Sequence, residues 1–190
     1  MDVAQKGGQT LGQHIHLGIT ADAIERGGYE YVFLQDLSLS CARVGTDSFR
    51  YQDIINNAKI ISKWIKVKSP SAKIFYENTW AYPANNYGGF GSFEKFDEAA
   101  LRGSRIMSSE LGATISPIAV AFAIAREQRS DIQLYYSDNH HQSEYGAYLK
   151  ACVNYLMLFG GEFSGMADSC GLDPEKAAFL RNAAMQAVRR

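Results

Sequence analysis

Long apolar runs, clustered charge of one sign and a basic-then-apolar N-terminus are all missing from this 190-residue sequence. A membrane-spanning helix needs about 20 consecutive apolar residues, and no run approaches that length, so we expect no membrane partner. Lysine and arginine are scattered and the net charge is -1, which argues against nucleic acid as a partner. The first residues do not have the pattern of a signal peptide, and the compartment stays undetermined.

Cysteine is scarce, with three residues at widely separated positions: Cys41, Cys152 and Cys170. An odd number at such spacing predicts neither a disulfide framework nor a zinc site. Cys152 falls in an apolar helical pattern and is expected to be a small core residue. His14 and His16 stand two positions apart, which places them on different faces of a helix. We therefore expect no metal and no other cofactor.

What the sequence does contain is the balance of a globular domain, with 46% hydrophobic and 21% charged residues. Apolar runs rich in β-branched and aromatic residues predict buried strands, and apolar residues recurring every three or four positions predict helices. Strands are expected at 29–35, 72–79 and 113–118, with the tail of another at 1–5; helices are expected at 11–26, 48–68, 93–111, 119–127, 143–159 and from 174 onward. This alternation predicts one α/β domain over residues 1–190, a three-layer α/β/α sandwich on a mostly parallel sheet.

A turn containing Asp138 and His141 follows a short apolar run at 131–136 and opens into the helix that Ser143 caps. Both side chains can lie together on this turn, where a strand gives way to a helix. In a Ser-His-Asp device the acid fixes the tautomer of the imidazole, and the imidazole activates a hydroxyl. The alternative is a pair that only caps the turn. His140 is expected to face solvent or the rim of a pocket and not to form a metal pair.

Three further segments carry polar groups that suit a binding site. The Gly7-Gly8 turn is either a plain loop or a place where backbone N–H groups approach a substrate oxygen. Gln35 and its polar neighbours Asp36 and Ser38 follow a buried strand, at the end where open α/β sheets place their chemistry. The aromatic and amide-rich loop 80–91 suits a sugar or a small ester, or else packs over the sheet edge.

Taken together, these blocks resemble the SGNH (GDSL-type) hydrolases. Asp138-x-x-His141, followed by the helix that begins Ser-Glu-x-Gly-x-Tyr-Leu, is similar to the last block of that superfamily. The likeness is closer to a branch of gut and environmental bacteria whose final block reads Asp-Gly-x-His-Pro-Ser. Asn139 and Gln142 take its Gly and Pro positions. The segments 7–11, 31–35 and 77–82 fit the same branch.

The resemblance implies a flavodoxin-like fold and the hydrolysis of esters, often of acyl groups on carbohydrates. A small ester or an acylated carbohydrate would then be the substrate. Carried over position by position, His141 would be the general base and Asp138 its partner. Gly8 would donate its backbone N–H to the oxyanion, and Gln35 would occupy the amide position.

The chain departs from the family at the nucleophile. The family's serine stands in a Gly-Asn/Asp-Ser block after the first strand, well before the glycine block, whereas the glycine block here begins at Gly7. The first strand and the serine block are missing, so we expect an N-terminally truncated hydrolase domain. The other candidate nucleophiles lack the Gly-x-Ser setting or stand in a linker: Ser38, Ser40, Cys41, Ser137 and the segment 167–169.

A missing first strand leaves the strand at 31–35 with a row of unpaired backbone groups. Each buried hydrogen bond left unmade costs on the order of 1–3 kcal/mol. We therefore expect this edge to pair with another chain, giving a homo-oligomer, or with the N-terminal segment. Whether the chain turns over any substrate stays open, and the alternative function is a catalytically inactive hydrolase-fold protein that binds a small ligand or a partner chain.

Overall fold

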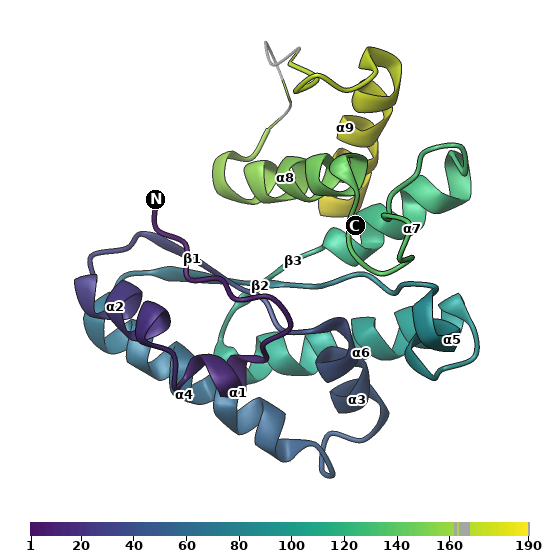
Figure 1. Cartoon of the computed structure of the whole chain (residues 1–190). Helices are drawn as coiled ribbons and strands as arrows, with labels where there is room; N and C mark the ends of the chain where they lie inside the picture. Colours follow the sequence, from purple (N-terminus) through teal and green to yellow (C-terminus); the bar gives the residue numbers. More distant parts are fainter. Residues whose placement is uncertain (162, 164–167, 190) are drawn as a thin grey trace. The chain divides into compact units, whose positions relative to one another are not determined.

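The computed structural model describes residues 1–161, 163 and 168–189 (Figure 1). The chain divides into two compact units. The first comprises Met1–Thr79 and Glu98–Ile115, and the second comprises Trp80–Asp97 and Ser116–Arg190. Within the described residues, no helix combines the length and the apolar character that crossing a membrane would require.

A three-stranded sheet organises the first unit. Its strands stand in the order β1-β2-β3, and their bounds are Tyr31–Leu34, Lys73–Glu77 and Thr114–Ser116. β1 and β2 run parallel, with Leu34 opposite Tyr76, which confirms the expected parallel pairing. Since β1 ends the order, one of its edges pairs with no strand in the part of the chain that the structure describes. The expected strand at 1–5 is wrong, because Asp2 binds the Arg26 guanidinium and the Tyr29 hydroxyl instead.

The helices of the first unit lie on one face of this sheet (Figure 1). They are α1 (Leu11–His14), α2 (Gly18–Arg26), α3 (Ser38–Thr46), α4 (Gln52–Lys68) and α6 (Phe93–Leu111), of which α6 has the expected bounds. The single helix expected over 11–26 is wrong, because the chain breaks at 15–17 between two short helices. Gly12 and Gly18 both weaken a helix here. Gly112, in the left-handed conformation, ends α6, and the next amide bonds back to the Ser108 carbonyl.

The contact between α3 and α6 is made backbone to backbone. A Cβ atom on Gly103 would overlap the carbonyl oxygen of Cys41, and one on Gly45 would overlap that of Ala99. Around this contact lies the apolar core of the unit, which includes Val44, Met107 and side chains of α4 and β2. The sequence pattern did not predict α3, because small and polar residues occupy the face on which α6 rests.

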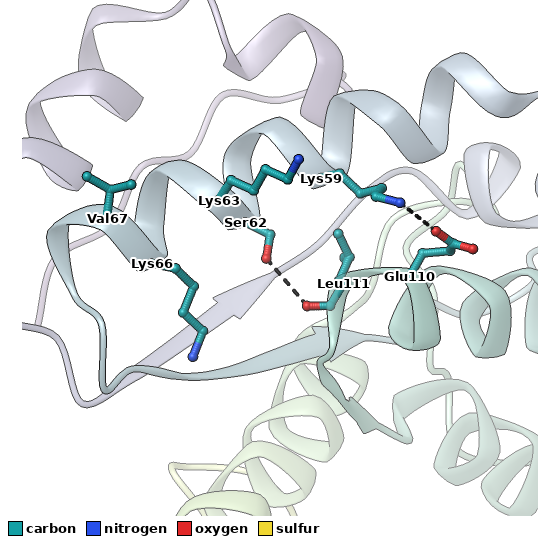
Figure 2. A pocket seen from close by; sticks show the side chains of 7 residues that line it. All are labelled: Lys59, Ser62, Lys63, Lys66, Val67, Glu110 and Leu111. Carbon is teal, nitrogen blue, oxygen red and sulfur yellow. Dashed lines mark hydrogen bonds and ion pairs between the residues drawn. The ribbon is translucent and has the colours of Figure 1, made fainter.

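A groove of about 520 Å³ lies between α4 and the end of α6 (Figure 2). Three lysines of α4 line it. Lys59 pairs with Glu110 at 2.8 Å, and Lys66 donates to the Ala72 carbonyl at 2.5 Å. Because two of the three ammonium groups already have protein partners, the groove is not a preformed anion site.

The second unit is mainly helical. α7 (Ile118–Gln128), α8 (Glu144–Phe159) and α9 (Pro174–Val188) pack on one another, and α5 (Ala84–Gly88) is a short turn in the loop expected at 80–91. Ser143 caps α8 by accepting from the Gly146 amide at 3.2 Å, and Asp173 caps α9 by accepting from the Lys176 amide at 2.9 Å. Both helix starts were predicted from the sequence and are confirmed.

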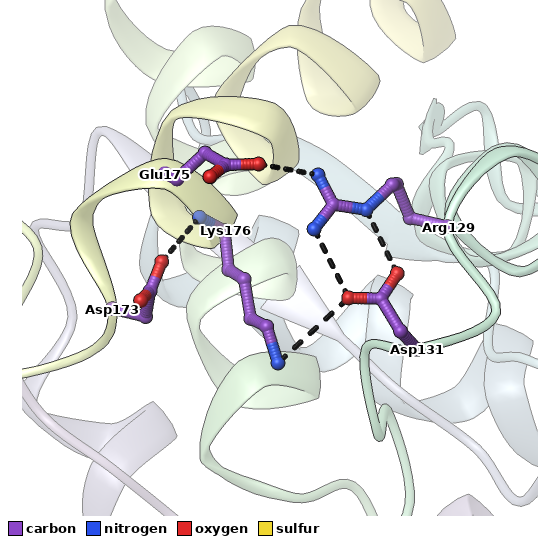
Figure 3. A network of polar contacts seen from close by, with 5 residues as sticks. All are labelled: Arg129, Asp131, Asp173, Glu175 and Lys176. Atoms are coloured by element: carbon purple, nitrogen blue, oxygen red, sulfur yellow. Dashed lines mark hydrogen bonds and ion pairs between the residues drawn. The ribbon is translucent and has the colours of Figure 1, made fainter.

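An ion-pair network joins the end of α7 to the start of α9 (Figure 3). The Arg129 guanidinium binds both carboxylate oxygens of Asp131, at 2.8 and 3.0 Å, and reaches Glu175 at 3.0 Å. The bond from Arg129 lowers the pKa of Asp131 to about 2. The carboxylates of this network are largely exposed, and solvent-exposed pairs add little to stability.

Candidate active site

A narrow hairpin at 134–143 carries the site in the second unit. The Tyr136 amide bonds to the His141 carbonyl at 2.9 Å, and the Ser143 amide bonds to the Leu134 carbonyl at 2.9 Å. The strand expected to precede the turn is wrong, since a single antiparallel bridge between Tyr135 and Gln142 is the only β-pairing here among the described residues. The chain pairs with itself and passes directly into α8, which holds the tip of the hairpin in place.

Asp138 lies at the tip and accepts three hydrogen bonds. Its Oδ1 atom accepts the backbone amides of His140 at 2.9 Å and His141 at 3.0 Å. Its Oδ2 atom is 2.6 Å from Nδ1 of His141. The bond with the His141 side chain, and after it the two backbone amides, lowers the pKa of Asp138 to about 2. The carboxylate is therefore ionised at any pH where an ester hydrolase works, and it can only accept.

The ionisation state of Asp138 determines which nitrogen of the neutral His141 ring carries the proton. Because the ionised carboxylate has no proton to give, Nδ1 of His141 donates in their 2.6 Å contact. The neutral ring then carries its lone pair on Nε2, the nitrogen that a general base uses. The His141 side chain is 71% exposed, so this nitrogen is open to a reacting group. The expectation that Asp138 and His141 lie together is confirmed, and a base-and-orienter pair is the chemistry that this geometry supports.

The backbone conformation of Asn139 limits which residue types can occupy its position in the turn. Its φ angle is 53°, in the left-handed region that glycine and asparagine adopt most readily. This explains physically why glycine stands at the same position in the hydrolase block that the sequence resembles. Its carbonyl accepts the Ala84 amide at 3.1 Å, which ties the turn to the start of α5.

Buried aromatic side chains form a floor beneath the hairpin. The Trp80 indole donates to the His140 carbonyl at 3.2 Å and stacks on Phe122 with ring centres 4.7 Å apart. The Tyr135 hydroxyl donates to the Ala81 carbonyl at 2.8 Å. Trp80 and Tyr82 are 8% and 4% exposed, so their faces are not available to a sugar. For these two residues the packing interpretation of the loop is the right one.

The loop also contains a left-handed helical turn. Asn85, Asn86 and Tyr87 have φ angles of 54°, 52° and 56°, and the following Gly88 and Gly89 are left-handed too. Non-glycine residues pay a steric cost in this conformation, which asparagine bears best. The turn follows the Ala84 amide that bonds to Asn139, so it lies beside the hairpin within the second unit.

A shallow cavity of about 430 Å³ adjoins the hairpin. It is lined by hairpin residues, including Tyr136 and Asn139, and by Glu144 and Tyr145 from the first turn of α8. Tyr136 is half-exposed there. The cavity offers aromatic and polar groups to a ligand next to the turn that bears Asp138.

Gly8 and Gln35, the predicted oxyanion and amide residues, belong to the first unit. Gly8 lies in an exposed turn closed by the Gln9 amide on the Lys6 carbonyl at 3.4 Å, with a φ of 70° that favours glycine. Gln35 is exposed directly after β1. Their roles stay predictions, because they depend on groups in both units.

Most of the polar groups after β1 are buried. Cys41 is fully buried with its Sγ atom 3.0 Å from the Tyr76 hydroxyl, and burial raises the pKa of this thiol to about 11. A thiol that stays protonated is a poor nucleophile, which argues against Cys41 in that role. Asp36 is also buried, and burial raises its pKa, while it accepts the Leu37 amide at 2.7 Å. Ser38 and Ser40 are buried as well, whereas Ser137 is exposed.

The Asp168-Ser169 pair also serves local structure. The Asp168 side chain accepts the Cys170 amide at 2.7 Å, and its carbonyl accepts the Tyr148 hydroxyl at 3.0 Å. Ala167, which precedes it in the motif-like segment, lies outside the described residues. Across the described ranges, no group of three or more metal-ligating side chains could hold an ion.

Sequence reasoning missed Asp97, the fifth residue of α6. Its Oδ1 atom is buried without a hydrogen-bond partner, and burial raises the pKa of this carboxyl to about 6, against the opposing effect of Arg126. The helical pattern placed Asp97 among ordinary helix residues. No sequence signal marked it, because its burial comes from the chain that packs over it.

Replacing Asp97 by asparagine is expected to change how stability depends on pH. The pKa of Asp97 is higher in the folded chain, so its contribution to the free energy of unfolding is complete below about pH 3.8 and is lost as the pH rises through about 6. Asp97→Asn should remove that loss and gain on the order of 1–2 kcal/mol at pH 8 relative to pH 4. Urea unfolding of both proteins at the two pH values measures the difference. Glu127→Gln, which changes an exposed carboxylate near the end of α7, is the control. Equal pH dependence in wild type and Asp97→Asn would contradict the assignment.

Comparison with known proteins supports the fold. A crystal structure of a DUF4886 family protein from Bacteroides uniformis matches with a TM-score of 0.72 and 19% identity, over 88% of this chain and 65% of that one. A protein from Slackia heliotrinireducens, proposed to be an SGNH hydrolase, matches with a TM-score of 0.63 and 21% identity, over 80% of each chain. No protein-family model matches the sequence, and neither does any curated protein.

These likenesses confirm the expected α/β fold of the SGNH-hydrolase type. At 19% and 21% identity, these likenesses are evidence for the fold and not for the chemistry. The chain spans about two thirds (65%) of the length of the Bacteroides uniformis protein.

Proposed function

We propose that this chain is the His-Asp part of an SGNH-type hydrolase that cleaves ester bonds, with its nucleophilic serine supplied from outside residues 1–190. Acyl groups on carbohydrates are the substrate class that we expect first. The observation that carries the proposal is the 2.6 Å contact between Asp138 and Nδ1 of His141 on an exposed hairpin. The fold is similar to that of the Slackia heliotrinireducens protein proposed to be an SGNH hydrolase, which supports the proposal.

The proposed reaction uses each group for one task. Nε2 of His141 takes the proton of the serine hydroxyl as the oxygen attacks the ester carbonyl. Asp138 stabilises the imidazolium that forms. The backbone N–H of Gly8 and the amide of Gln35 are proposed to hold the oxyanion. His141 then protonates the leaving alcohol, and a water molecule, activated in the same way, releases the acyl group.

The test compares this chain with a version extended by the codons upstream of Met1. We expect the extended protein to hydrolyse p-nitrophenyl acetate and acetylated sugars and to react with a fluorophosphonate probe, and the 190-residue chain to do neither. Equal rates for the two proteins would overturn the idea that the serine lies outside this sequence. A folded extended protein with no turnover and no labelling would overturn the hydrolase assignment itself.

A second candidate is a catalytically inactive protein that uses the same fold to bind a small ligand. The observation in its favour is that no serine of the chain stands in a Gly-x-Ser setting. This candidate predicts ligand binding that is unaffected by His141→Ala. The first candidate predicts labelling and turnover that depend on His141.

We also propose that the free edge of β1 pairs with a second copy of the chain. β1 ends the sheet order, and Tyr31 at its start is 47% exposed. Sedimentation velocity at micromolar concentration is expected to show a dimer, and Tyr31→Lys is expected to shift it to monomer because a charge on an edge strand opposes pairing. Ile19→Lys, an exposed apolar residue on α2, is the control. A monomeric wild-type chain would contradict this proposal.

A further inference from the structure

His140 is held more firmly than the histidine that follows it. Its backbone carbonyl accepts the Trp80 indole at 3.2 Å, and its backbone amide donates to Asp138 at 2.9 Å. Its ring is half-buried and lies 4.0 Å, centre to centre, from the buried ring of Tyr82 at an angle of 39°. Tyr82 in turn meets the buried Phe96 edge-on, at 4.9 Å and 80°. His140 is therefore fixed to the packed interior of the second unit.

The imidazole of His141 stacks on that fixed ring. The two ring centres are 4.6 Å apart and the planes are 27° from parallel. The hydrogen bond to Asp138 fixes the position and tautomer of Nδ1, but an exposed ring with a single side-chain bond can still tilt about that bond. A stacked neighbour restricts the tilt, because offset-stacked rings attract and exclude water between them. The direction of Nε2 is then set by two contacts instead of one.

We propose that His140 is a positioning residue, whose ring, backed by Tyr82, fixes the plane of the His141 ring and so aims Nε2. The assignment rests on the proposed role of His141 as general base. A base acts well only when its nitrogen lies within hydrogen-bond reach of the proton that it takes, so a ring held in one plane favours transfer. Asp138 determines which nitrogen of His141 carries the proton, and His140 determines the direction in which Nε2 points.

The charge state of His140 suits this task. Burial, and after it the positive charge that His141 can carry, lower the pKa of His140, while Asp138 acts in the opposite direction. The titratable groups in contact with His140 are Asp138, His141 and the Tyr82 phenol. At neutral pH a neutral ring stacks on His141 without repelling the imidazolium that forms during catalysis. In acid, protonated His140 would place a positive charge against that imidazolium.

Two substitutions at His140 distinguish the effect of its ring from the effect of its charge. His140→Phe keeps a ring in the stack but cannot be charged, and His140→Ala removes the ring. With ¹³C and ¹⁵N labels in the histidines of the 190-residue chain, NMR reports the tautomer and the order parameter of the His141 ring without any need for turnover. We expect wild type and His140→Phe to show an ordered ring with the proton on Nδ1. In His140→Ala we expect the Nδ1 proton to stay and the order parameter to fall.

Kinetics of the upstream-extended protein give a second measurement. His140→Ala is expected to lower kcat by about threefold to tenfold with KM little changed, the size of one lost ring contact. His140→Phe should keep kcat at neutral pH and retain more activity than wild type in acid. An unchanged order parameter for His141 in a folded His140→Ala chain, or a pH profile of His140→Phe that matches wild type, would overturn the inference. If the NMR result holds and no protein turns over ester, the proposed function fails and the positioning contact stands.

Discussion

Replacing His141 by alanine in the upstream-extended protein is expected to lower kcat for p-nitrophenyl acetate by about 10²–10⁴-fold, because the reaction loses its general base. KM should change little, since the ring acts on the proton and not on the bound ester. His16→Ala, which removes an exposed histidine of the first unit, should leave the rate as it is. Comparable activity in wild type and His141→Ala would mean that the hairpin is not the catalytic centre.

Asp138→Asn tests the other half of the pair. An amide keeps the shape of the carboxylate but can donate, so it allows the wrong tautomer of His141, and kcat should fall by about 10³–10⁴-fold. The carboxylate itself stays ionised from pH 5 to 8, because the pKa of Asp138 is lowered to about 2. Any stability that the ionised group contributes is present above about pH 3.8 and is lost only as the pH falls through about 2. Comparable kcat in wild type and Asp138→Asn would contradict this assignment.

Gly103→Ala is expected to destabilise the first unit by about 3–5 kcal/mol or to prevent folding, because the added methyl group would overlap the Cys41 carbonyl between α3 and α6. Neither helix can move away without disturbing the core beneath it. Chemical denaturation monitored by circular dichroism measures the loss. The matched control is Gly18→Ala at the first residue of α2, where a Cβ meets nothing and little change in stability is expected.

Gly45→Ala should behave like Gly103→Ala, since its Cβ would overlap the Ala99 carbonyl in the same contact. α3 begins just after Gln35 and Asp36, so its position against α6 also sets where those groups lie. A wild-type unfolding midpoint for either variant would show that the helices separate easily. The close approach would then have no structural importance.

Features that depend on neighbours in the chain could be predicted from the sequence. Ser143 and Asp173 cap helices by bonding to amides three residues ahead, and Gly112 ends α6 through its own backbone freedom. The Asp138–His141 pair is of the same kind, because residues three apart on a tight turn meet without help from the rest of the fold. The α/β fold class followed from the alternation of patterns for the same reason.

Features that depend on packing between distant segments of the chain could not be predicted from the sequence. α3 escaped prediction because its helix is stabilised by a glycine on α6, more than fifty positions along the chain. The residues expected to form a strand before Asp138 became one arm of a hairpin, because their partners lie just beyond the turn. Trp80 and Tyr82 looked suited to a ligand and proved to be the floor under His140, since only packing decides which aromatic faces stay exposed.

The sequence by itself determined the chemical groups of the site and the short-range bonds among them, because a tight turn and a helix cap are complete within a few residues. Only the tertiary structure decided which of these groups are buried and which are exposed to solvent. It buried Asp97 and Cys41, left His141 open, and brought the ring of Tyr82 against His140. The physical reason is that burial and stacking are set by contacts between segments distant in the chain, and no local pattern contains both partners.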